Sequence, residues 1–592
     1  MKAVLSTLNA KYIHASLALP YLKLYCEDPS WQIEILEFTI NQPLEDIRTR
    51  LYLSQPDVLS FSCYIWNIEQ TLSLCRDLQK LLPNCVFILG GPEVSFDAAD
   101  LLTRNQGIGI VVRGEGEETF KAVLEHIVQD YPLAGINGIT YREGADIYNN
   151  PDRQFIENLD QIPSPYQGDL SAYHDRLLYY ESSRGCPFNC SYCLSSTFKG
   201  VRTFSMDRVK NDLRLLMDNR IRTVKFVDRT FNSNEKRAKE IMEFILEHNI
   251  STRFHFEVCA DLMSDEFISF LLQVPPETFA FEIGIQSTYI PALQAVGRSC
   301  DLQRFGSNVR QLSANGNIHL HLDLIAGLPL EGYGHFRSSF NQVYEFYPDM
   351  IQLGFLKLLK GTTIRRDAGK YGYIFQEAPP YQVMSSDYII YPEFIMLANI
   401  ERLLERYYNS GEFKTALKYI VYFLYQGDAF AFFESMASFA EKHDWFRQGH
   451  NRAAEYNILM QFIEERHPDH RIITNEYLKY DFIFNNRHSP LPEKLLLNLP
   501  DKAQENLYQL LKDRSFIDQN LPEWSDLSKY DLSKRLHLAY FSLDPTNLTS
   551  QEKVRTAILF VYPVNQRRAD RILLIQDDDA PDKLNAQGQA FV

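Results

Sequence analysis

The sequence predicts an α/β protein with three regions: a doubly wound, Rossmann-like parallel sheet, a partial six-stranded α/β barrel, and an α-rich C-terminal region. The first two follow from short apolar strands that alternate with amphipathic helices, once in the first 130 residues and again from Leu177 to Leu356. Beyond about residue 379 the alternation stops and long helical stretches dominate. With 592 residues, the chain is long enough for several domains that each bury a core.

In the first region, each apolar run of strand length is followed by a stretch with helical periodicity. We expect strands at 3–8, 32–38, 57–62, 85–89 and 108–113, and helices at 16–25, 43–54, 67–82 and 117–130. We interpret DVLSFS and CVFIL as strands buried on both faces of a parallel sheet, because CVFIL is apolar throughout and DVLSFS carries Val58, Leu59 and Phe61. This domain is expected to span residues 1–135.

Residues 136–174 predict a linker, because they contain one hairpin-like turn and the proline-rich segment NLDQIPSPY. Six βα repeats then begin at LLYYESS, TVKFVD, TRFHFEV, FAFEIGI, HLHLDLIAG and MIQLGFL. They predict a partial (β/α)6 barrel over residues 175–378. Residues 379–592 predict an α-rich domain with two late strands, LHLAYFSL and AILFVYP, and no motif there indicates a role.

The composition disfavours three classes of protein: nucleic-acid binders, membrane proteins and secreted disulfide-rich proteins. Lys and Arg total 60 and Asp and Glu total 76, for a net charge of −16, which disfavours a surface that grips nucleic acid or anionic lipid. No basic segment followed by a long apolar run opens the chain, and no later stretch predicts a membrane span. Nine cysteines are too few for a secreted disulfide scaffold. We therefore expect a cytoplasmic protein with reduced thiols and no membrane partner.

Three of the cysteines are closely spaced. Cys186, Cys190 and Cys193 form a C-x3-C-x2-C pattern directly after the first expected barrel strand. Thiolates bind iron and zinc, and one short loop can wrap three of them around a cluster. A zinc site would need a fourth ligand, and no histidine lies between His174 and His248. Three unrelated buried cysteines are the remaining alternative. Three ligands leave one iron of a four-iron cluster free, at the mouth where such barrels keep their chemistry.

With Tyr192 in the aromatic position, the triplet resembles the C-x3-C-x-aromatic-C motif of the radical S-adenosylmethionine (SAM) superfamily. The segments VKFVDRTFNSN (224–234), FEIGIQSTYIPALQAVGR (281–298) and DLIAGLPLEG (323–332) resemble later motifs of that superfamily, in the same order. The resemblance implies a [4Fe–4S] cluster on the three cysteines and reductive cleavage of SAM to a 5′-deoxyadenosyl radical. It also implies an electron donor such as flavodoxin or ferredoxin.

The same resemblance implies which residues hold SAM. Tyr192 would lie against the adenine. Four further side chains would line the pocket: Asp228, Glu282, Gln286 and Arg298. Carboxylates suit an ammonium or ribose hydroxyls, Gln offers a donor and an acceptor, and Arg suits the SAM carboxylate. For each of them, a salt bridge or a strand-end cap with a structural role is the alternative.

Two glycine motifs follow strands of the first domain, LGGPEVS (89–95) and VVRGEGEETF (111–120). Glycines at the carboxyl ends of strands let a ligand approach the backbone. Together with DVLSFS, these motifs resemble the cobalamin-binding domain that is fused to many radical SAM enzymes. The resemblance implies cobalamin contacts with four glycines: Gly90, Gly91, Gly114 and Gly116. The D-x-H-x-x-G pattern that supplies a cobalt ligand is absent, and His14 has a different context. The domain would bind cobalamin without a histidine ligand, or serve substrate binding or structure instead.

The resemblance therefore implies a radical SAM enzyme that uses cobalamin for a methyl transfer or a rearrangement on an unknown substrate. An alternative is a radical SAM enzyme that modifies tRNA or transfers a methylthio group, which would take an RNA substrate and a second cluster on N-terminal cysteines. A non-catalytic iron–sulfur sensor or scaffold is an alternative of another class. The triplet together with Tyr192, Gln286 and Arg298 favours an enzyme, and the acidic balance disfavours tRNA.

Overall fold

A computed structural model describes residues 1–12, 14–168, 170–197, 200–495, 502–548, 554–564, 566–577 and 584–586. The chain divides into two compact units. Unit 1 comprises Met1–Pro348 and Gln352–Phe394, and unit 2 comprises Asp349–Ile351 and Ile395–Val592. In the described part of the chain, no helix combines the length and the apolarity needed to cross a membrane.

The first sheet of unit 1 has seven strands in the order β2-β1-β3-β4-β5-β6-β7. They are β1 (Lys2–Asn9), β2 (Gln32–Thr39), β3 (Val58–Ser62), β4 (Val86–Gly90), β5 (Ile110–Val112), β6 (Ile139–Glu143) and β7 (Asp146–Asn149). The helices are α1 (Ala18–Tyr25), α2 (Leu44–Leu53), α3 (Ile68–Leu81), α4 (Ala98–Arg104) and α5 (Glu117–Gln129). Strands β1 to β5 pair in parallel, and the strand order reverses between β1 and β3. The predicted doubly wound sheet is confirmed.

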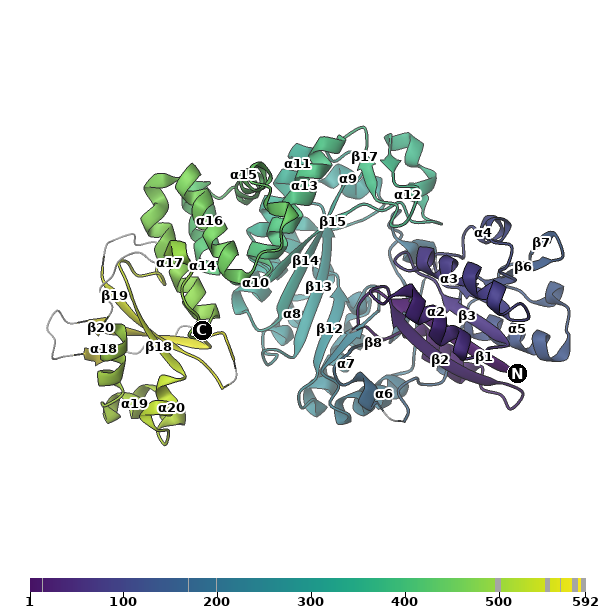
Figure 1. The fold of residues 1–592 in the computed structure, drawn as a ribbon, viewed down its shortest axis with the longest axis horizontal. Helices are drawn as coiled ribbons and strands as arrows, with labels where there is room; N and C mark the ends of the chain where they lie inside the picture. The colour runs from purple at the N-terminus through teal and green to yellow at the C-terminus, as the bar shows by residue number, and fades with distance from the viewer. Residues whose placement is uncertain are drawn as a thin grey trace. The chain divides into compact units, whose positions relative to one another are not determined.

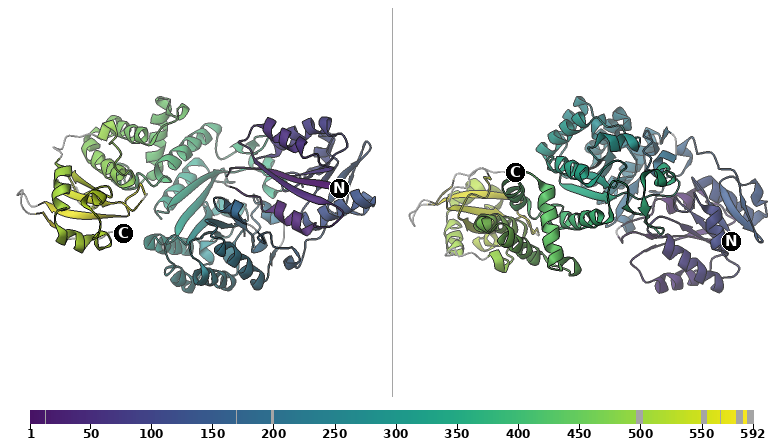
Figure 2. Two further views of the ribbon diagram at one scale, coloured as in Figure 1. Left: turned by 60° about the horizontal axis from the view of Figure 1, so that its bottom comes forward. Right: turned by 90° about the horizontal axis from the view of Figure 1, so that it is seen from above.

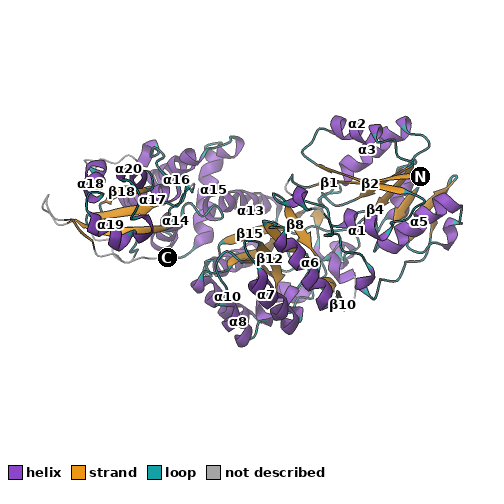
Figure 3. Ribbon diagram, turned by 90° about the horizontal axis from the view of Figure 1, so that it is seen from below, coloured by secondary structure: helices purple, strands orange, loops and turns teal. Residues whose placement is uncertain are grey.

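Helices cover both faces of this sheet: α2 and α3 lie on one side, and α1 and α5 lie on the other (Figures 1 and 3). Val4 and Leu8 belong to the apolar cluster that includes side chains of α2, α3 and α4. Their neighbours Ala3 and Leu5 belong to a second cluster, with side chains of α1 and α5. Alternate residues of a strand point to opposite faces, so a strand covered on both faces must be apolar throughout.

The sheet continues beyond the predicted boundary near residue 135. Strands β6 and β7 form the expected hairpin, but β6 also pairs antiparallel with β5, so the sheet extends to Asn149. Strand β5 is only three residues long and would otherwise leave its outer edge unpaired. The hairpin covers that edge, which the sequence pattern alone does not reveal.

The second sheet of unit 1 has six strands in the order β15-β14-β13-β12-β11-β8. They are β8 (Leu177–Tyr180), β11 (Thr223–Phe226), β12 (Arg253–Val258), β13 (Phe279–Gln286), β14 (His319–Ala326) and β15 (Met350–Phe355). The helices are α6 (Met206–Asp218), α7 (Glu235–His248), α8 (Asp265–Leu271), α9 (Ile290–Ala295), α10 (Leu302–Asn315) and α11 (Tyr333–Tyr344). The partial barrel is confirmed, and each of its six strands lies where the sequence predicts one.

Helices α6, α7, α8 and α10 lie along one side of the barrel sheet (Figures 2 and 3). Aromatic rings fill the space beneath them: the ring of Phe226 lies 4.6 Å from that of Phe256 and 5.0 Å from that of Tyr180. The intervening residues on the other face of these strands are polar, as in Lys225 and His255. One face of the sheet therefore carries the core, and the other is available for chemistry.

Short elements at the ends of the barrel strands were not predicted. They are β9 (Ser183–Cys186), β10 (Gly200–Thr203), α12 (Thr363–Arg366), β16 (Ile374–Phe375) and β17 (Val383–Ser385). Strands β9 and β10 form an antiparallel hairpin between β8 and α6. The cysteine triplet begins at the last residue of β9.

Unit 2 is mainly helical, as predicted, and ends in a small antiparallel sheet. Helix α13 (Tyr391–Leu403) begins in unit 1 and continues into unit 2. The other helices of unit 2 are α14 (Lys414–Tyr419), α15 (Ala429–Lys442), α16 (Arg452–Arg466), α17 (Arg471–Asn485), α18 (Ala503–Leu510), α19 (Arg514–Asn520) and α20 (Lys529–Ser533). Its strands are β18 (Leu536–Phe541), β19 (Thr556–Val561), β20 (Arg571–Asp577) and β21 (Leu584–Ala586). The first two are the predicted late strands. Aromatic side chains such as Tyr407, Tyr419 and Phe433 are fully buried and build its core.

The close packing of Gly91, at the end of β4, against Cys63, after β3, can be tested by substitution. Its φ is +102°, and an added Cβ would lie 2.6 Å from the carbonyl oxygen of Cys63. We expect Gly91→Ala to lower the thermal unfolding midpoint, because backbone strain and the clash cost about 1–3 kcal/mol. Gly135→Ala is the matched control, since nothing lies within 4 Å of its added Cβ. Equal midpoints for the two variants would contradict this packing.

Candidate active site

The three clustered cysteines lie in the loop that joins β9 to β10. Cys186 ends β9, and its Sγ lies 3.6 Å from Oγ1 of Thr230. Cys190 is buried, and its Sγ lies 3.9 Å from a guanidinium nitrogen of Arg298. Sγ of Cys193 accepts from the backbone N–H of Ser195 at 3.4 Å. Cys186 and Cys193 are partly exposed, so the loop presents thiols at the carboxyl end of the barrel strands.

Within the described ranges, no three Cys, His, Asp or Glu side chains converge on a point where one metal ion would be held. A four-iron cluster does not require such convergence, because each thiolate binds a different iron. Three soft thiolate donors on one loop are the ligand type that an iron–sulfur cluster uses. The chemistry of the donor set therefore fits the predicted cluster.

Arg298 connects the cysteine loop to strand β13. Besides approaching Cys190, its guanidinium donates to the carbonyl oxygen of Gly284, while its Nε is buried without a hydrogen-bond partner among the described residues. The loop is also fixed to the end of α9, since the N–H of Ser191 donates to the oxygen of Val296 at 2.8 Å. Tyr192 lies close to Arg298 and Cys190, and burial raises the pKa of its phenol. The structure therefore brings Cys190, Tyr192 and Arg298 together.

Gln286 ends β13 in an unusual conformation. Its φ is +71°, and the pairing of β13 with β14 is irregular between Gly284 and Gln286. Its Oε1 is buried and has no hydrogen-bond partner in the described part of the chain. Left-handed backbone at a non-glycine residue costs free energy and is concentrated at ligand sites. A buried acceptor next to Gly284, which also contacts Arg298, fits the ammonium or hydroxyl groups of SAM.

The residue after Gln286 is held by a buried carboxyl that the sequence analysis did not single out. Glu331 accepts from Oγ of Ser287 at 2.6 Å and from Oγ of Ser339 at 3.0 Å. Burial raises the pKa of Glu331 to about 7. Glu331 lies in the quoted segment DLIAGLPLEG, but nothing in the local pattern marks a carboxyl that will be enclosed. It fixes the strand end that carries Gln286.

Glu282 lies on the polar face of the barrel sheet and pairs with protein groups. Its Oε2 is 2.7 Å from Nζ of Lys225 and 3.2 Å from Nε2 of His255. Burial alone would raise the pKa of Glu282, but these two contacts lower it. Glu282, which the sequence predicts to line the SAM pocket, is therefore the centre of a group of ion pairs. It lies on β13, two residues before Gly284.

We call that group the inner-face cluster; its members, from four neighbouring strands, are Lys225, His255, Glu257, Glu282, His321 and Asp323. His321 lies 3.1 Å from Asp323. Burial, with help from Glu282 directly opposite in the strand register, raises the pKa of Glu257 to about 7. The signal was present in the sequence as polar residues at alternate strand positions, but the pattern does not say which of them meet.

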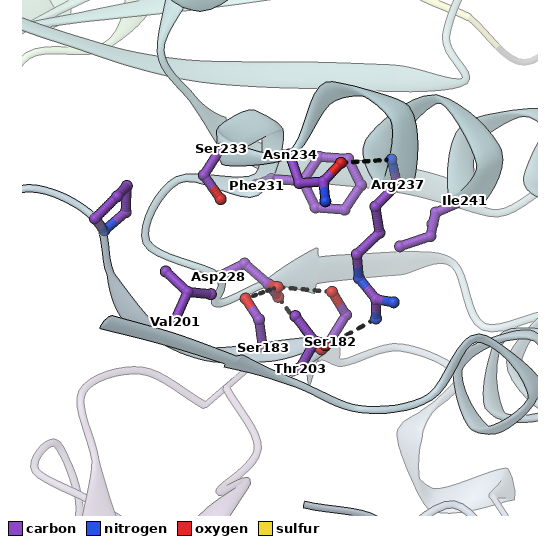
Figure 4. A pocket seen from close by; sticks show the side chains of 11 residues that line it. Ser182, Ser183, Val201, Thr203, Asp228, Phe231, Ser233, Asn234, Arg237 and Ile241 are labelled. Carbon is purple, nitrogen blue, oxygen red and sulfur yellow. Dashed lines mark hydrogen bonds between the residues drawn. The ribbon is translucent and has the colours of Figure 1, made fainter. Parts of the chain in front are cut away.

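Asp228 is engaged elsewhere. It accepts from the N–H of Ser182 at 2.9 Å, from its Oγ at 2.6 Å, and from Oγ of Ser183. Figure 4 shows this carboxylate facing the start of the β9–β10 hairpin, below the side chain of Phe231. It lines a cavity of about 250 Å³ together with Arg237. The hydrogen bonds of Asp228 hold the start of β9, and its role in the SAM pocket stays a prediction.

In the first domain, the carboxyl ends of β1, β3 and β4 form the crevice where the strand order reverses. Tyr64 and Trp66 follow β3, and their rings stack at 4.5 Å with an angle of 4°. Trp66 is 44% exposed, and its indole N–H donates to the oxygen of Leu8. Gly90 and Gly91 end the neighbouring strand β4. A flat, exposed aromatic surface beside glycine backbone fits a large planar macrocycle.

The remaining residues of interest in this domain lie nearer the barrel. Gly114 and Gly116 flank Glu115 in the loop between β5 and α5, and nothing lies within 4 Å of a Cβ added to Gly114. The ring of His14 lies 5.8 Å from that of Tyr179, on the edge strand of the barrel, and burial lowers the pKa of His14. His14 is therefore placed against β8.

Loops after the carboxyl ends of both sheets meet within unit 1. Nζ of Lys360, after β15, lies 3.0 Å from Glu93 and 2.8 Å from Asp97, which follow β4. Arg184, after β8, lies 2.6 Å from Glu117, which follows β5. The ends of the two sheets where ligands of such folds bind thus adjoin one another.

Comparison with protein-family models agrees with this arrangement. Residues 4–124 match a model described as "B12 binding domain", and residues 180–343 match "Radical SAM superfamily". The chain is a radical SAM protein with an N-terminal B12-binding domain. A third model, "Protein of unknown function (DUF4080)", matches residues 369–560. The predicted resemblance is confirmed, and the two domains imply a [4Fe–4S] cluster, SAM and cobalamin as cofactors.

This radical SAM protein is similar to several methyltransferases. It is 26% identical over 312 residues to 2-(S-pantetheinyl)-carbapenam-3-carboxylate methyltransferase of Streptantibioticus cattleyicolor, over 50% of this chain and 45% of the relative. It is 31% identical over 222 residues to hopanoid C-3 methylase of Methylococcus capsulatus, over 35% of this chain and 41% of the relative. The chain thus spans about half the length of the curated relatives that it matches.

Solved structures share the fold. The cobalamin-dependent SAM radical enzyme OxsB with aqua-cobalamin bound gives a TM-score of 0.57 at 16% identity, over 87% of this chain and 84% of that one. The radical SAM methyltransferase TsrM from Kitasatospora setae, with cobalamin and a [4Fe–4S] cluster bound, gives 0.53 at 17% identity, over 64% and 78%. The predicted fold class is confirmed, whereas the individual cofactor-binding residues stay predictions.

Glu331 makes the site's stability depend on pH. Because its pKa is about 7 in the folded protein and lower in the unfolded chain, the folded protein retains the proton more tightly. The resulting stabilisation is complete below the unfolded-state pKa and is lost as the pH rises through 7. Between pH 5 and pH 8, we expect the thermal unfolding midpoint of the wild type to fall relative to that of Glu331→Gln, because only the wild type loses this stabilisation. The exposed Glu27→Gln is the control, and parallel pH profiles for Glu331→Gln and wild type would refute the assignment.

Proposed function

We propose that this protein is a cobalamin-dependent radical SAM enzyme that transfers a methyl group to, or rearranges, a polar small molecule held in its barrel. The observation that carries the proposal is that the carboxyl ends of the two sheets lie together. Two ion pairs connect segments that follow strands of different sheets: Lys360 with Glu93, and Arg184 with Glu117. A cofactor in the crevice of the first sheet and a cluster on the cysteine loop would then share one reaction space.

Each predicted cofactor residue has a role in this proposal. Cys186, Cys190 and Cys193 would hold the cluster. When bound, the cluster supplies the electron that cleaves a carbon–sulfur bond of SAM, and cobalamin supplies a methyl carrier. An electron donor such as flavodoxin or ferredoxin would deliver that electron.

Near the cluster, Arg298 would bind the SAM carboxylate, because a guanidinium offers several donors and already approaches Cys190 at 3.9 Å. Gln286 would accept from an ammonium or hydroxyl through its unpartnered Oε1. Tyr192 would stack against the adenine. Glu282 and Asp228 would act through protein contacts, Glu282 within the inner-face cluster and Asp228 by holding the start of β9.

In the first domain, glycine backbone would allow cobalamin to approach the strand ends at four positions: Gly90, Gly91, Gly114 and Gly116. Tyr64 and Trp66 would supply an apolar, planar contact surface.

The inner-face cluster favours a polar substrate. His255 Nε2, His321 Nε2 and Asp323 Oδ1 are buried without a hydrogen bond of good geometry among the described residues. His255 does contact Glu282 at 3.2 Å, and His321 contacts Asp323 at 3.1 Å, but these contacts are between members of the cluster. An apolar substrate would remove water from this polar face without adding a partner, whereas a substrate with polar groups would supply hydrogen bonds.

The tRNA-modifying alternative lacks support from the N-terminal cysteines. Cys63 and Cys75 lie in the apolar core that includes side chains of α3, and Cys26 lies in the core on the opposite face of the sheet. Burial raises the pKa of all three thiols. Such surroundings disfavour the thiolates that a second cluster would need.

The cluster assignment can be tested by anaerobic reconstitution. Wild type is expected to bind about four irons per chain and, with SAM and a reductant, to release 5′-deoxyadenosine or S-adenosylhomocysteine. Cys186→Ala should lose both properties because it removes one of three ligands, whereas Cys85→Ala, in the first domain, should keep them. A Cys186→Ala variant with full iron content would overturn the assignment. Release of neither product by the wild type would remove the enzymatic function.

The cobalamin site can be tested by titration with hydroxocobalamin, followed by quenching of tryptophan fluorescence or by absorbance. Trp66→Ala is expected to weaken binding by roughly 2- to 10-fold, because an aromatic contact is worth about 0.5–1.5 kcal/mol. Tyr52→Ala, which removes an aromatic side chain of similar exposure at the end of α2, is the control. Unchanged affinity in Trp66→Ala would place the macrocycle elsewhere.

A further inference from the structure

The β9–β10 hairpin that carries the cysteine loop places two positive charges side by side. Arg184 on β9 is directly opposite Arg202 on β10, and Cys186 is opposite Gly200 at the open end of the same ladder. Like charges at directly opposed positions destabilise an antiparallel pair. A two-stranded ribbon of four residues per strand has little other stabilisation, so this hairpin requires compensation from outside.

The compensation comes mainly from the B12-binding domain. Glu115 accepts from both terminal nitrogens of Arg202, at 2.6 and 3.1 Å, and from Arg184 at 3.2 Å. Glu117 accepts from Arg184 at 2.6 Å. The third nitrogen of Arg184 donates to Glu181, at the end of β8, at 2.9 Å. All three donor nitrogens of Arg184 thus point to carboxylates, two of which belong to the other domain.

These ion pairs are shielded from water. The side chain of Arg184 is 13% exposed, that of Glu115 15% and that of Glu117 7%. Charge-assisted hydrogen bonds of this kind are about twice as strong as neutral ones, and a buried charge that loses its partner is costly. The contact between Arg202 and Glu115 is bidentate, which also fixes the direction of the hairpin.

The hairpin is held on its other side by the barrel. Asp228 binds Ser182 and Ser183 at the start of β9, as Figure 4 shows. The linker contributes as well, because the N–H of Ile156 donates to Glu115 at 2.9 Å. The segment that ends in Cys186 is therefore clamped between the two domains of unit 1.

The two glutamates belong to the motif RGEGEETF, whose glycines are predicted to contact cobalamin. Glu115 lies between Gly114 and Gly116, so one short loop carries both the glycines that are predicted to contact cobalamin and a carboxylate that holds the hairpin. We propose that Glu115 and Glu117 are positioning residues for the cysteine loop, and that occupancy of the cobalamin crevice is transmitted through them to the cluster site. The second half of this inference rests on the proposed function; the first half does not.

Hydrogen–deuterium exchange of the full-length protein without cofactors tests the positioning role. In Glu115→Gln, amides of β9 and β10 are expected to exchange about tenfold faster than in wild type, which corresponds to the loss of about 1.4 kcal/mol from a charged hydrogen bond. Glu240→Gln is the matched control: it breaks the 2.7 Å contact between Lys210 and Glu240 on the outer helices of the barrel. Equal exchange in Glu115→Gln and wild type would overturn the proposal.

A double variant separates positioning from general loss of folding. Glu115→Gln with Arg202→Gln removes the like-charge pair together with its counter-charge, so its hairpin is expected to exchange more slowly than that of Glu115→Gln alone. If the double variant exchanges as fast as, or faster than, the single variant, charge compensation is not the cause and the proposal fails.

Release of iron to a chelator tests the coupling. Reconstituted Glu115→Gln is expected to lose iron several-fold faster than wild type or Glu240→Gln. Hydroxocobalamin should slow the loss in wild type and have little effect in Glu115→Gln. Wild type that binds iron and cobalamin but shows no protection would overturn the coupling alone. Wild type that binds no iron would instead overturn the proposed function, and the exchange experiment would still decide the positioning role.

Discussion

Unit 1 depends on one arginine that serves two domains. Arg184 lies on the first strand of the hairpin that leads into the cysteine loop, and its guanidinium donates to Glu115, Glu117 and Glu181. A planar guanidinium with donors in fixed directions can satisfy three carboxylates at once, which an ammonium could do only with less directional control. The relative placement of the two sheets, the path of β9 and the position of Cys186 are all linked to this contact.

Other residues of the candidate site follow the carboxyl ends of strands in the two sheets. Parallel sheets direct all their carboxyl ends to one edge, so residues far apart in sequence, such as Tyr64, Arg184 and Lys360, follow strands whose ends adjoin. Strand interiors then orient the chemistry: the aromatic face of β11 and β12 packs beneath helices, and the opposite face carries the inner-face cluster. At the end of β13, the strained conformation of Gln286 is retained because Ser287 is held by the buried Glu331.

Most of the architecture could be predicted, because each parallel strand is a continuous apolar run or a clear alternation. The β9–β10 hairpin could not, since its strands have four residues each, both contain a glycine and an arginine, and β9 ends in a cysteine. The triplet was recognisable from spacing alone. The partners of Asp228 and Glu282 were not, because a pattern of alternation places a residue on a face without saying which neighbour it meets. The sheet boundary near residue 135 was wrong for a similar reason, as the need of β5 for an edge partner is a tertiary effect.

The six cysteines outside the triplet have one environment in common. Burial raises the pKa of every one of them, namely Cys26, Cys63, Cys75, Cys85, Cys259 and Cys300. A protonated thiol is a poor ligand and a poor nucleophile, so these side chains do not compete for ferrous iron or sulfide while a cluster assembles. Nine thiols in one chain would otherwise offer many wrong combinations. Burial also raises the pKa of Cys190, but the neighbouring Arg298 counteracts that effect, and Cys190 shares its loop with two partly exposed thiols. The combination of burial elsewhere and a cationic neighbour in the loop thereby favours cluster assembly on the triplet.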